Sequence, residues 1–456
     1  MKNYLWSSFL LLLIVMAVLT GMHFLPQINL FGHTMRQVDL LADLRNKLEA
    51  EDSLEIDSLL LPKVKPLFVD TCKSGLTCIE DYADSTRQFG MDHFYEALGK
   101  IKQMDRPVRI AYFGDSFIEA DILTGDLRSM LQSEYGGCGV GYVPITYTMT
   151  GFRPTIHYAF NGWESHFKID TIGFRSKYQD IAGNYFFPNK GAYVLLKGEK
   201  KYAPHLDTCE VSTIYFRSFG HLHLTSTING KKRQSFTIKG DGQLQKVSVT
   251  DTIGRVQWAV ADCDSATFYG VAMESRQGIC LDNLANRGSS GVNLTGIPMK
   301  MLQETHRERP YDLLVLQYGL NVAQTHQKDY TTYQEEMKEV IDHLKTAFPD
   351  VSILLISIGD REYNRSSDGE LHTMPGVKNL IRFQQTIAAE NNIAFWNLYE
   401  AMGGEGSIVE MVDKHMANLD YTHINFKGGK HLAGIFFETI KYGKEQYDKR
   451  KAYEAE

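Results

Sequence analysis

The spacing of apolar residues divides the chain into stretches with different periods. Residues 9–25 form an apolar run, FLLLLIVMAVLTGMHFL. From about 136 to 274, short runs with a period of two are separated by turn residues, which is typical of β-strands. On both sides of this block, at 91–135 and after about 278, strand-like apolar runs alternate with amphipathic helical segments. The pattern therefore predicts an α/β fold interrupted by an all-β insertion.

Strands and helices are expected to alternate in the α/β part. The strands are expected at 108–116, 312–321, 351–360 and 393–399, and the helices at 91–105, 118–135, 330–348, 377–391 and 425–448. Strands that are apolar throughout are typical of a parallel sheet with helices on both faces. The expected fold class is thus a three-layer α/β/α sandwich with a parallel sheet, formed by 89–140 and 275–450. The insertion, 141–274, is predicted to be a β-sandwich with a hairpin turn at Asn229-Gly230, and KRKAYEAE a solvated C-terminal tail.

The apolar run near the N-terminus indicates in which cellular compartment the folded part of the chain lies. About 17 residues of helix span roughly 25 Å, which is near the lower limit for crossing a bilayer. No small-x-small cleavage site or cysteine follows the run. We interpret 1–28 as a signal anchor that forms a transmembrane helix; a cleaved signal peptide and a buried core helix are the alternatives. Because Lys2 precedes the run, the sequence predicts a single-pass inner-membrane protein with its folded part in the periplasm.

The next segment, 29–88, is expected to connect that anchor to the folded part. A helical period over 35–50 predicts a membrane-proximal helix, and the acidic, proline-containing stretch 51–70 a linker. Cys72 and Cys78 are close enough in sequence to close a small loop. Four further cysteines are scattered and form no CxxC pair, so no metal site of that kind is expected: Cys138, Cys209, Cys263 and Cys280.

Composition narrows the classes of function. The 456-residue chain is 43% hydrophobic, which excludes disorder over most of its length. A net charge of −7 argues against a protein built to hold nucleic acid. The glycine-rich stretch 136–141 follows a helix and lacks a Gly-Lys-Ser/Thr ending, so a phosphate-binding loop is rejected. No cofactor is expected.

Aromatic and histidine side chains of the insertion have two interpretations. They could stack on sugars, which would make the insertion a carbohydrate-binding domain, or pack within it. His221-x-His223 could ligate a metal, but no third ligand is evident, so no metal is predicted. The residues concerned are Trp163, His221, His223 and Trp258.

Two polar clusters end predicted strands of the α/β part, Gly114-Asp115-Ser116 and Gly319-Leu320-Asn321, and a third, Asp420-Tyr421-Thr422-His423, lies in the loop before the last predicted helix. In an open parallel sheet, ligands bind beyond the carboxyl ends of the strands, so these clusters are expected to share one edge. A serine hydroxyl becomes nucleophilic when a histidine removes its proton, and a carboxylate can hold that histidine in the required tautomer. Backbone N–H groups and an asparagine amide can bind the developing oxyanion. The alternatives are structural: a capping serine, a turn asparagine and a hydrogen-bonded histidine.

Four segments resemble, in order, the four sequence blocks of the SGNH/GDSL hydrolases: GDSF (114–117), NRGSSG (286–291), GLN (319–321) and DYTH (420–423). The resemblance covers about 91–140 and 278–445. It implies that Ser116 is the nucleophile, His423 the base and Asp420 the residue that orients it. It also implies an oxyanion hole of Ser116, Gly291 and Asn321.

The match departs from the family pattern in two places. Val322 stands where the third block usually has Asp, which puts the packing of that loop in doubt more than the role of Asn321. In the second block, Gly288 is an alternative to Gly291.

The resemblance further implies a reaction class. Bacterial envelope O-acetyl esterases and O-acetyltransferases of this family act on acetylated polysaccharide or peptidoglycan. We therefore expect a Ser-His-Asp enzyme that forms an acetyl-enzyme, which water or a sugar hydroxyl then resolves. A membrane acyltransferase is the partner that transfer would imply. The alternative is a non-catalytic glycan-binding or assembly protein on the same scaffold.

Overall fold

The computed structural model describes residues 4–23, 29–30, 33–34, 68–149, 151–170, 172–363 and 371–456. The chain divides into two compact units, Met1–Phe68 and Val69–Glu456. In the first unit, α1 (Tyr4–His23) is followed by β1 (Asn29–Leu30) and β2 (His33–Thr34), which pair antiparallel. The helix predicted at 35–50 and most of the linker predicted at 51–70 lie outside the described residues.

The transmembrane prediction for 1–28 is wrong. Within the described residues, no helix has the length and apolarity needed to cross a membrane. The single-pass inner-membrane location inferred from this helix is therefore wrong as well.

The second unit contains a mixed six-stranded sheet in which five consecutive strands run parallel. Its order is β14-β4-β15-β16-β19-β3, and β3 is the one strand of this sheet that pairs antiparallel. Every residue of β4, β15 and β16 is buried, which explains why these strands are apolar throughout. The bounds are β3 (Glu80–Asp81), β4 (Val108–Gly114), β14 (Ile279–Ala285), β15 (Leu313–Gln317), β16 (Ser352–Ile356) and β19 (Ala394–Trp396).

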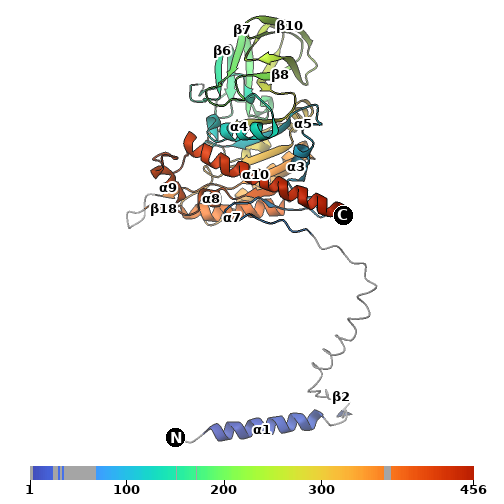
Figure 1. Cartoon of the computed structure of the whole chain (residues 1–456), viewed down its shortest axis with the longest axis vertical. Coiled ribbons are helices and arrows are strands. Elements are labelled where there is room, and N and C mark those ends of the chain that lie inside the picture. The colour runs from blue at the N-terminus through green and yellow to red at the C-terminus, as the bar shows by residue number, and fades with distance from the viewer. Residues whose placement is uncertain are drawn as a thin grey trace. The chain divides into compact units, whose positions relative to one another are not determined.

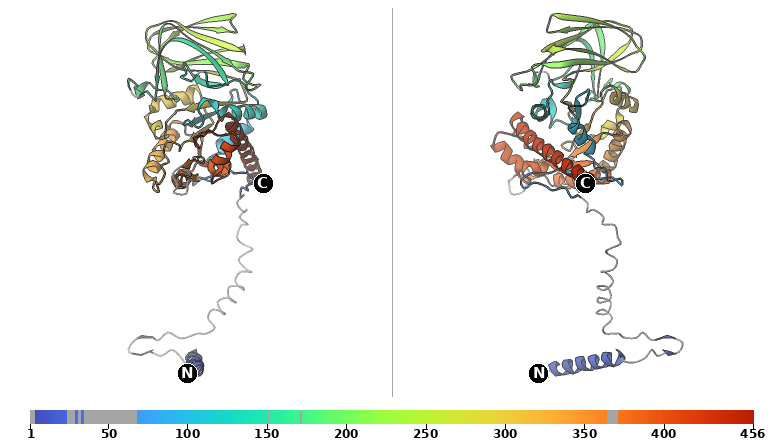
Figure 2. Two further views of the ribbon diagram at one scale, coloured as in Figure 1. Left: turned by 90° about the vertical axis from the view of Figure 1, so that its left-hand side faces the viewer. Right: turned by 45° about the vertical axis from the view of Figure 1, so that its right-hand side comes forward.

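Helices pack in two groups around this sheet (Figures 1 and 2). One group is α3 (Asp92–Gly99), α4 (Thr124–Tyr135) and α10 (Phe426–Ala455); the other is α5 (Met299–Glu308), α6 (Thr331–Ala347) and α7 (Pro375–Glu390). The shorter elements are η1 (Glu119–Asp121), η2 (Ser176–Tyr178), η3 (Val292–Gly296), α8 (Leu398–Met402), α9 (Ser407–Asp413), β17 (Glu362–Tyr363) and β18 (His372–Thr373). The helices and strands predicted for the α/β part are thus present, with shifted ends.

The last helix is longer than predicted because α10 continues to Ala455, while most residues of the predicted solvated tail, 449–456, are exposed. Arg450 explains the extension. It is buried, forms an ion pair with Asp92 on α3 and another with Asp70 at 3.0 Å, and its guanidinium lies 3.9 Å from the ring centre of Phe89. These contacts hold the last turns of the helix against the fold.

The inserted segment forms one curled antiparallel sheet, so the β-sandwich prediction is wrong (Figure 1). The main path is β10-β9-β12-β7-β13-β8-β11, with β5 on β13 and β6 on β7. Because β7 and β13 also pair with each other, hydrogen bonds join all nine strands into one sheet. The bounds are β5 (Gly141–Pro144), β6 (Ile156–Phe167), β7 (Asn184–Gly198), β8 (Cys209–Ser218), β9 (His221–Ile228), β10 (Lys232–Lys239), β11 (Leu244–Ile253), β12 (Arg255–Cys263) and β13 (Ala266–Glu274).

The curl lets this sheet enclose a core of its own. Register shifts in β6, β12 and β13 mark bulges, which bend strands and increase their twist. Trp258, Phe216 and Phe268 are buried in the core that results. The predicted hairpin at Asn229-Gly230 is confirmed: Ile228 pairs with Lys232, both turn residues have positive φ, and the N–H of Lys231 donates to the Ile228 carbonyl oxygen at 3.0 Å.

Buried ion pairs join the two sheets. Arg309, directly after α5, lies with Nε 2.8 Å from Asp282 of β14 and with Nη1 2.9 Å from Glu274 of β13. Arg109 of β4 pairs with the same glutamate at 2.8 Å. Although burial disfavours a charged carboxyl, the two guanidinium groups hold the pKa of Glu274 well below its usual range. The inserted sheet is therefore fixed to the parallel sheet by charge as well as by chain connection.

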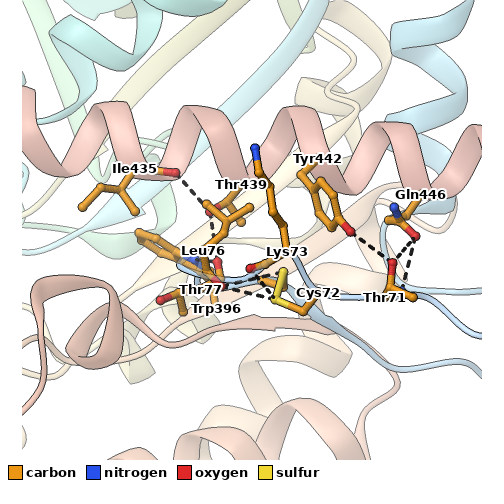
Figure 3. Close-up of a disulfide and its surroundings, with 11 residues drawn as sticks. Thr71, Cys72, Lys73, Leu76, Thr77, Trp396, Ile435, Thr439, Tyr442 and Gln446 are labelled. Atoms are coloured by element: carbon orange, nitrogen blue, oxygen red, sulfur yellow. Dashed lines mark hydrogen bonds between the residues drawn. A yellow bond between two sulfur atoms is a disulfide. The ribbon is translucent and has the colours of Figure 1, made fainter.

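A disulfide closes the short loop between Cys72 and Cys78, as the spacing of these two cysteines allows. Figure 3 shows the loop lying along α10. Thr71 Oγ1 lies 3.2 Å from Gln446 Oε1, to which it donates, and 3.1 Å from the hydroxyl of Tyr442. The start of the second unit is thereby attached to the helix that ends the chain.

We predict that Glu274→Gln lowers the free energy of unfolding by about 3 kcal/mol, because it leaves two buried guanidinium groups short of a counter-charge. Urea unfolding at neutral pH measures the change. Glu410→Gln is the matched control: Glu410 pairs with Lys414 on the exposed face of α9, and its loss should change stability by less than about 0.5 kcal/mol. Equal effects of the two substitutions would contradict a role for this network in stability.

Candidate active site

Ser116 follows the carboxyl end of β4 in a tight turn. The turn is close-packed: a Cβ on Gly114 would lie 2.8 Å from the side chain of Ile118. Asp115, which is buried, accepts a hydrogen bond from the N–H of Phe117 at 2.9 Å. The turn directs the Ser116 hydroxyl to His423, where Oγ lies 2.9 Å from Nε2.

His423 lies in the loop before α10 and is held by Asp420. Its Nδ1 lies 2.8 Å from Asp420 Oδ2, and its backbone N–H donates to Oδ1 at 3.0 Å. When Nδ1–H donates to the carboxylate, Nε2 is left as the acceptor for the serine hydroxyl. Partial burial opposes ionisation of Asp420, but hydrogen bonds from His423 and Thr422 hold its pKa below the usual range. Asn425 then caps α10 by accepting from two backbone N–H groups, which fixes the end of the loop.

The predicted oxyanion donors lie around the same turn. Asn321 follows β15 and donates from Nδ2 to the carbonyl oxygen of Ser289 at 2.9 Å. Gly291 is buried, and its N–H donates to Ser289 Oγ at 3.1 Å. A Cβ on Gly291 would lie 2.6 Å from the ring of Tyr318, and its φ of +91° is in the region that favours glycine. Gly288, the other candidate, is exposed and has nothing within 4 Å of a Cβ position. The structure thus brings Ser116, His423 and Asp420 together and leaves the Gly291 N–H engaged within its own loop.

The buried carboxyl of Asp115 sits beside these donors. Asn321 Nδ2 lies 3.4 Å from Asp115 Oδ2. Burial raises the pKa of Asp115 to about 6, and hydrogen bonds from the N–H groups of Phe117 and Leu320 oppose the rise only in part. Asp115 therefore orients the asparagine amide and the turn around the nucleophile.

Asp121 is a second buried carboxylate near the nucleophile, and the sequence analysis missed it. Residues 120 and 121 both have positive φ, 54° and 65°, an uncommon conformation for non-glycine residues. Burial opposes ionisation of Asp121, but two arginines keep its pKa far below the usual range. Its partners are Arg128 (3.1 Å), Arg153 (2.9 Å), Thr155 (2.5 Å) and Asn283 (3.1 Å). Two of these precede β6, so no local sequence signal could have paired them with Asp121.

A cavity of about 380 Å³ is lined by residues of the inserted segment and of the α/β part, among them Glu119, three residues after Ser116. Its volume is in the range of small-ligand sites. The insertion contributes Phe167, Lys168 and Asn184, and the α/β part contributes Glu119, Asn293 and the 286–289 loop. Ser289 lines the cavity and also accepts the hydrogen bond from Asn321. The cavity and the predicted oxyanion loop therefore share a wall.

The tryptophan and histidine side chains considered for sugar or metal binding make contacts within the inserted sheet. Trp258 is buried and its Nε1 donates to Ser212 Oγ, and Trp163 Nε1 donates to a backbone carbonyl oxygen in β7. His221 and His223 lie side by side on one face of β9, with ring centres 3.9 Å apart. In the described part of the chain, no group of three or more ligating side chains could hold a metal ion.

No family model matches the chain, and no curated protein matches its sequence at a significant level. Among solved structures, it is similar to one described as a peptidoglycan O-acetylesterase: the TM-score is 0.66, the identity is 17%, and 80% of this chain and 99% of that chain are covered. This likeness shows that the two chains share a fold.

Two more distant likenesses have TM-scores below 0.5 and support no conclusion. One is to a family two carbohydrate esterase from Clostridium thermocellum, with a TM-score of 0.28 and 11% identity over 63% of this chain and 99% of that chain. The other is to a protein described as GDSL-like lipase from Parabacteroides merdae, with a TM-score of 0.27 and 14% identity over 36% of this chain and 74% of that chain.

We predict a pH-dependent stability difference for Asp115→Asn. Between about pH 4 and pH 6 the folded protein holds a proton at Asp115 that the unfolded chain has lost, so this group reduces stability as pH rises through that window. A displacement of about two pKa units corresponds to ~3 kcal/mol. The stability of the variant relative to wild type should therefore rise by about this amount from roughly pH 4 to pH 7, measured by urea unfolding. A difference independent of pH would show that Asp115 ionises at its ordinary pKa.

We predict that Gly291→Ala lowers the free energy of unfolding by about 3 kcal/mol, because it combines an unfavourable φ with a clash against Tyr318. Gly288→Ala is the matched control. Its φ is also positive but its Cβ position is open, so it should cost only about 1 kcal/mol. Thermal and urea unfolding measure both variants. If the two costs are equal, the Tyr318 contact does not constrain this loop.

Proposed function

We propose that this protein is a serine esterase that removes O-acetyl groups from a polysaccharide, with Ser116 as nucleophile, His423 as general base and Asp420 as the residue that orients it. The observation that carries the proposal is the hydrogen-bonded chain from Ser116 Oγ through His423 to Asp420, with links of 2.9 and 2.8 Å. The substrate class is proposed from the fold that the chain shares with a solved peptidoglycan O-acetylesterase.

In the first half-reaction, Ser116 Oγ attacks the acetyl carbonyl carbon while its proton passes to His423 Nε2. Asp420 stabilises the imidazolium that forms. The negative charge on the carbonyl oxygen is bound by the Ser116 N–H and by the Asn321 amide. The Gly291 N–H joins them when it exchanges Ser289 Oγ for the oxyanion. The bond to the sugar oxygen then breaks, His423 protonates that oxygen, and an acetyl-enzyme remains.

In the second half-reaction, water replaces the sugar. His423 removes a proton from the water, hydroxide adds to the acetyl carbon, and acetate leaves as the proton returns to Ser116. Esterase is the simpler proposal because His423 and Asp420 are both about half exposed, so water reaches the site. Transfer to a sugar hydroxyl would need an arrangement that excludes water, and no contact of the described residues favours one.

We predict that Ser116→Ala lowers kcat for p-nitrophenyl acetate at least a thousand-fold, because it removes the atom that forms the acetyl-enzyme. Asp420→Asn should lower kcat by a comparable or smaller factor without preventing acetylation of Ser116, since the histidine remains. Release of p-nitrophenol measures turnover, and mass spectrometry of the quenched wild type should locate one acetyl group on Ser116.

Ser133→Ala is the matched control for the nucleophile. Ser133 Oγ also lies 2.9 Å from a histidine nitrogen, Nε2 of His205, but on the exposed face of α4. This variant should retain wild-type turnover. If wild type and Ser116→Ala cleave the ester at the same rate, the catalytic proposal fails, and the non-catalytic glycan-binding alternative takes its place.

A further inference from the structure

The cavity between the two sheets has the lining of a sugar site. Amide side chains and one exposed apolar side chain share its wall: Asn184, Asn286 and Asn293 among the amides, and Ile169 from the end of β6. Amides match sugar hydroxyls as donors and acceptors, and an apolar side chain covers the C–H face of a ring. Ser116 and His423 do not line the cavity, but Ser289 does, and its carbonyl oxygen accepts a hydrogen bond from Asn321, so the cavity adjoins the loop that holds Asn321.

Among the charged side chains that line the cavity, one positive charge has no carboxylate partner in the described part of the chain. Glu119, the acidic residue of the wall, is already paired with Arg287 by two contacts on one carboxylate oxygen. Arg153 is paired with the buried Asp121. Lys168 remains: its Nζ donates to the carbonyl oxygen of Asn293 at 2.5 Å, and no carboxylate of the described residues lies within ion-pair distance of it.

The surroundings of Lys168 agree with an ammonium group that has no carboxylate partner. Burial lowers the pKa of Lys168 to about 8, and no neighbouring carboxylate counteracts that effect. Partial burial of an ammonium group without a counter-ion costs desolvation energy. An anionic ligand group would remove that cost.

We propose that this cavity is a subsite for a carboxylate-bearing sugar of the substrate polymer, and that Lys168 binds the carboxylate. The proposal deepens the proposed function and rests on it for the chemistry at Ser116. One unpaired ammonium balances the single charge of a carboxylate, whereas a phosphate monoester carries nearly two. The substrate class is therefore an O-acetylated acidic glycan, with an acidic sugar beside or bearing the ester.

The test compares two acetylated polymers that differ only in charge. Polygalacturonic acid and its carboxyl-reduced form, acetylated to the same degree, serve as substrates, and acetate release gives kcat/KM for each. The wild type should prefer the acidic polymer about tenfold. Lys168→Met should abolish the preference through KM, while Lys168→Arg, which keeps the charge, should retain most of it.

Lys246→Met is the matched control. Lys246, on β11, also donates to a backbone carbonyl oxygen, that of Glu308, but it is exposed, lies within ion-pair distance of the Glu308 carboxylate and does not line the cavity. This variant should keep the wild-type preference. A wild type without preference, or a preference that survives Lys168→Met, would overturn the proposal.

A binding measurement separates the subsite from the catalytic proposal. Calorimetric titration of the Ser116→Ala protein with galacturonate oligosaccharides, and with their carboxyl-reduced forms, needs no turnover. Binding of the acidic forms alone, lost in Ser116→Ala/Lys168→Met, supports the subsite even if no ester is cleaved. Equal binding of both forms contradicts the subsite. Tighter binding of a sugar phosphate than of galacturonate would show that the cavity selects a phosphate and not a carboxylate.

Discussion

The geometry around the nucleophile depends on one buried carboxylate, Asp121. It lies five residues after Ser116 and holds the strained 120–121 turn by bonds to a helix, to a strand of the parallel sheet and to the start of the insertion. Backbone in the left-handed region persists only where its surroundings fix it. Arg153 and Thr155 supply part of that fixation from the insertion, although they lie more than thirty residues away in the chain. The insertion is therefore a structural part of the nucleophile turn.

A second network, of buried ion pairs, joins the inserted sheet to the parallel sheet. Glu274 accepts from Arg109 and Arg309, so the last residue of β13 is bound to the parallel sheet and to the residue after α5. Buried ion pairs of this kind add little net stability, but they tolerate few alternative arrangements. The cavity beside Ser289 has walls from both sheets, and its shape is fixed by the two networks together.

Local patterns in the sequence were sufficient for some features and insufficient for others. The parallel strands could be predicted because strands buried on both faces are apolar throughout, and Ser116, Asn321 and His423 because their blocks occur in order at the ends of elements. Alternation in the insertion predicts strands but not which strands share hydrogen bonds, so the single curled sheet was mistaken for a sandwich. The apolar run at 9–25 was interpreted as a membrane span, but no helix of the described residues has the length and apolarity to cross a membrane. Asp121 and Lys168 gave no signal, since their significance depends on partners brought close only by the fold.

The 30-residue helix α10 links distant parts of the second unit. Its cap, Asn425, stands two residues after His423, and its far end carries Arg450, which is bonded to Asp70. Near its middle and end, Tyr442 and Gln446 contact Thr71 beside the disulfide loop. The disulfide loop and the loop that holds His423 are thus attached to opposite ends of one helix, so a shift of α10 along its axis would displace both.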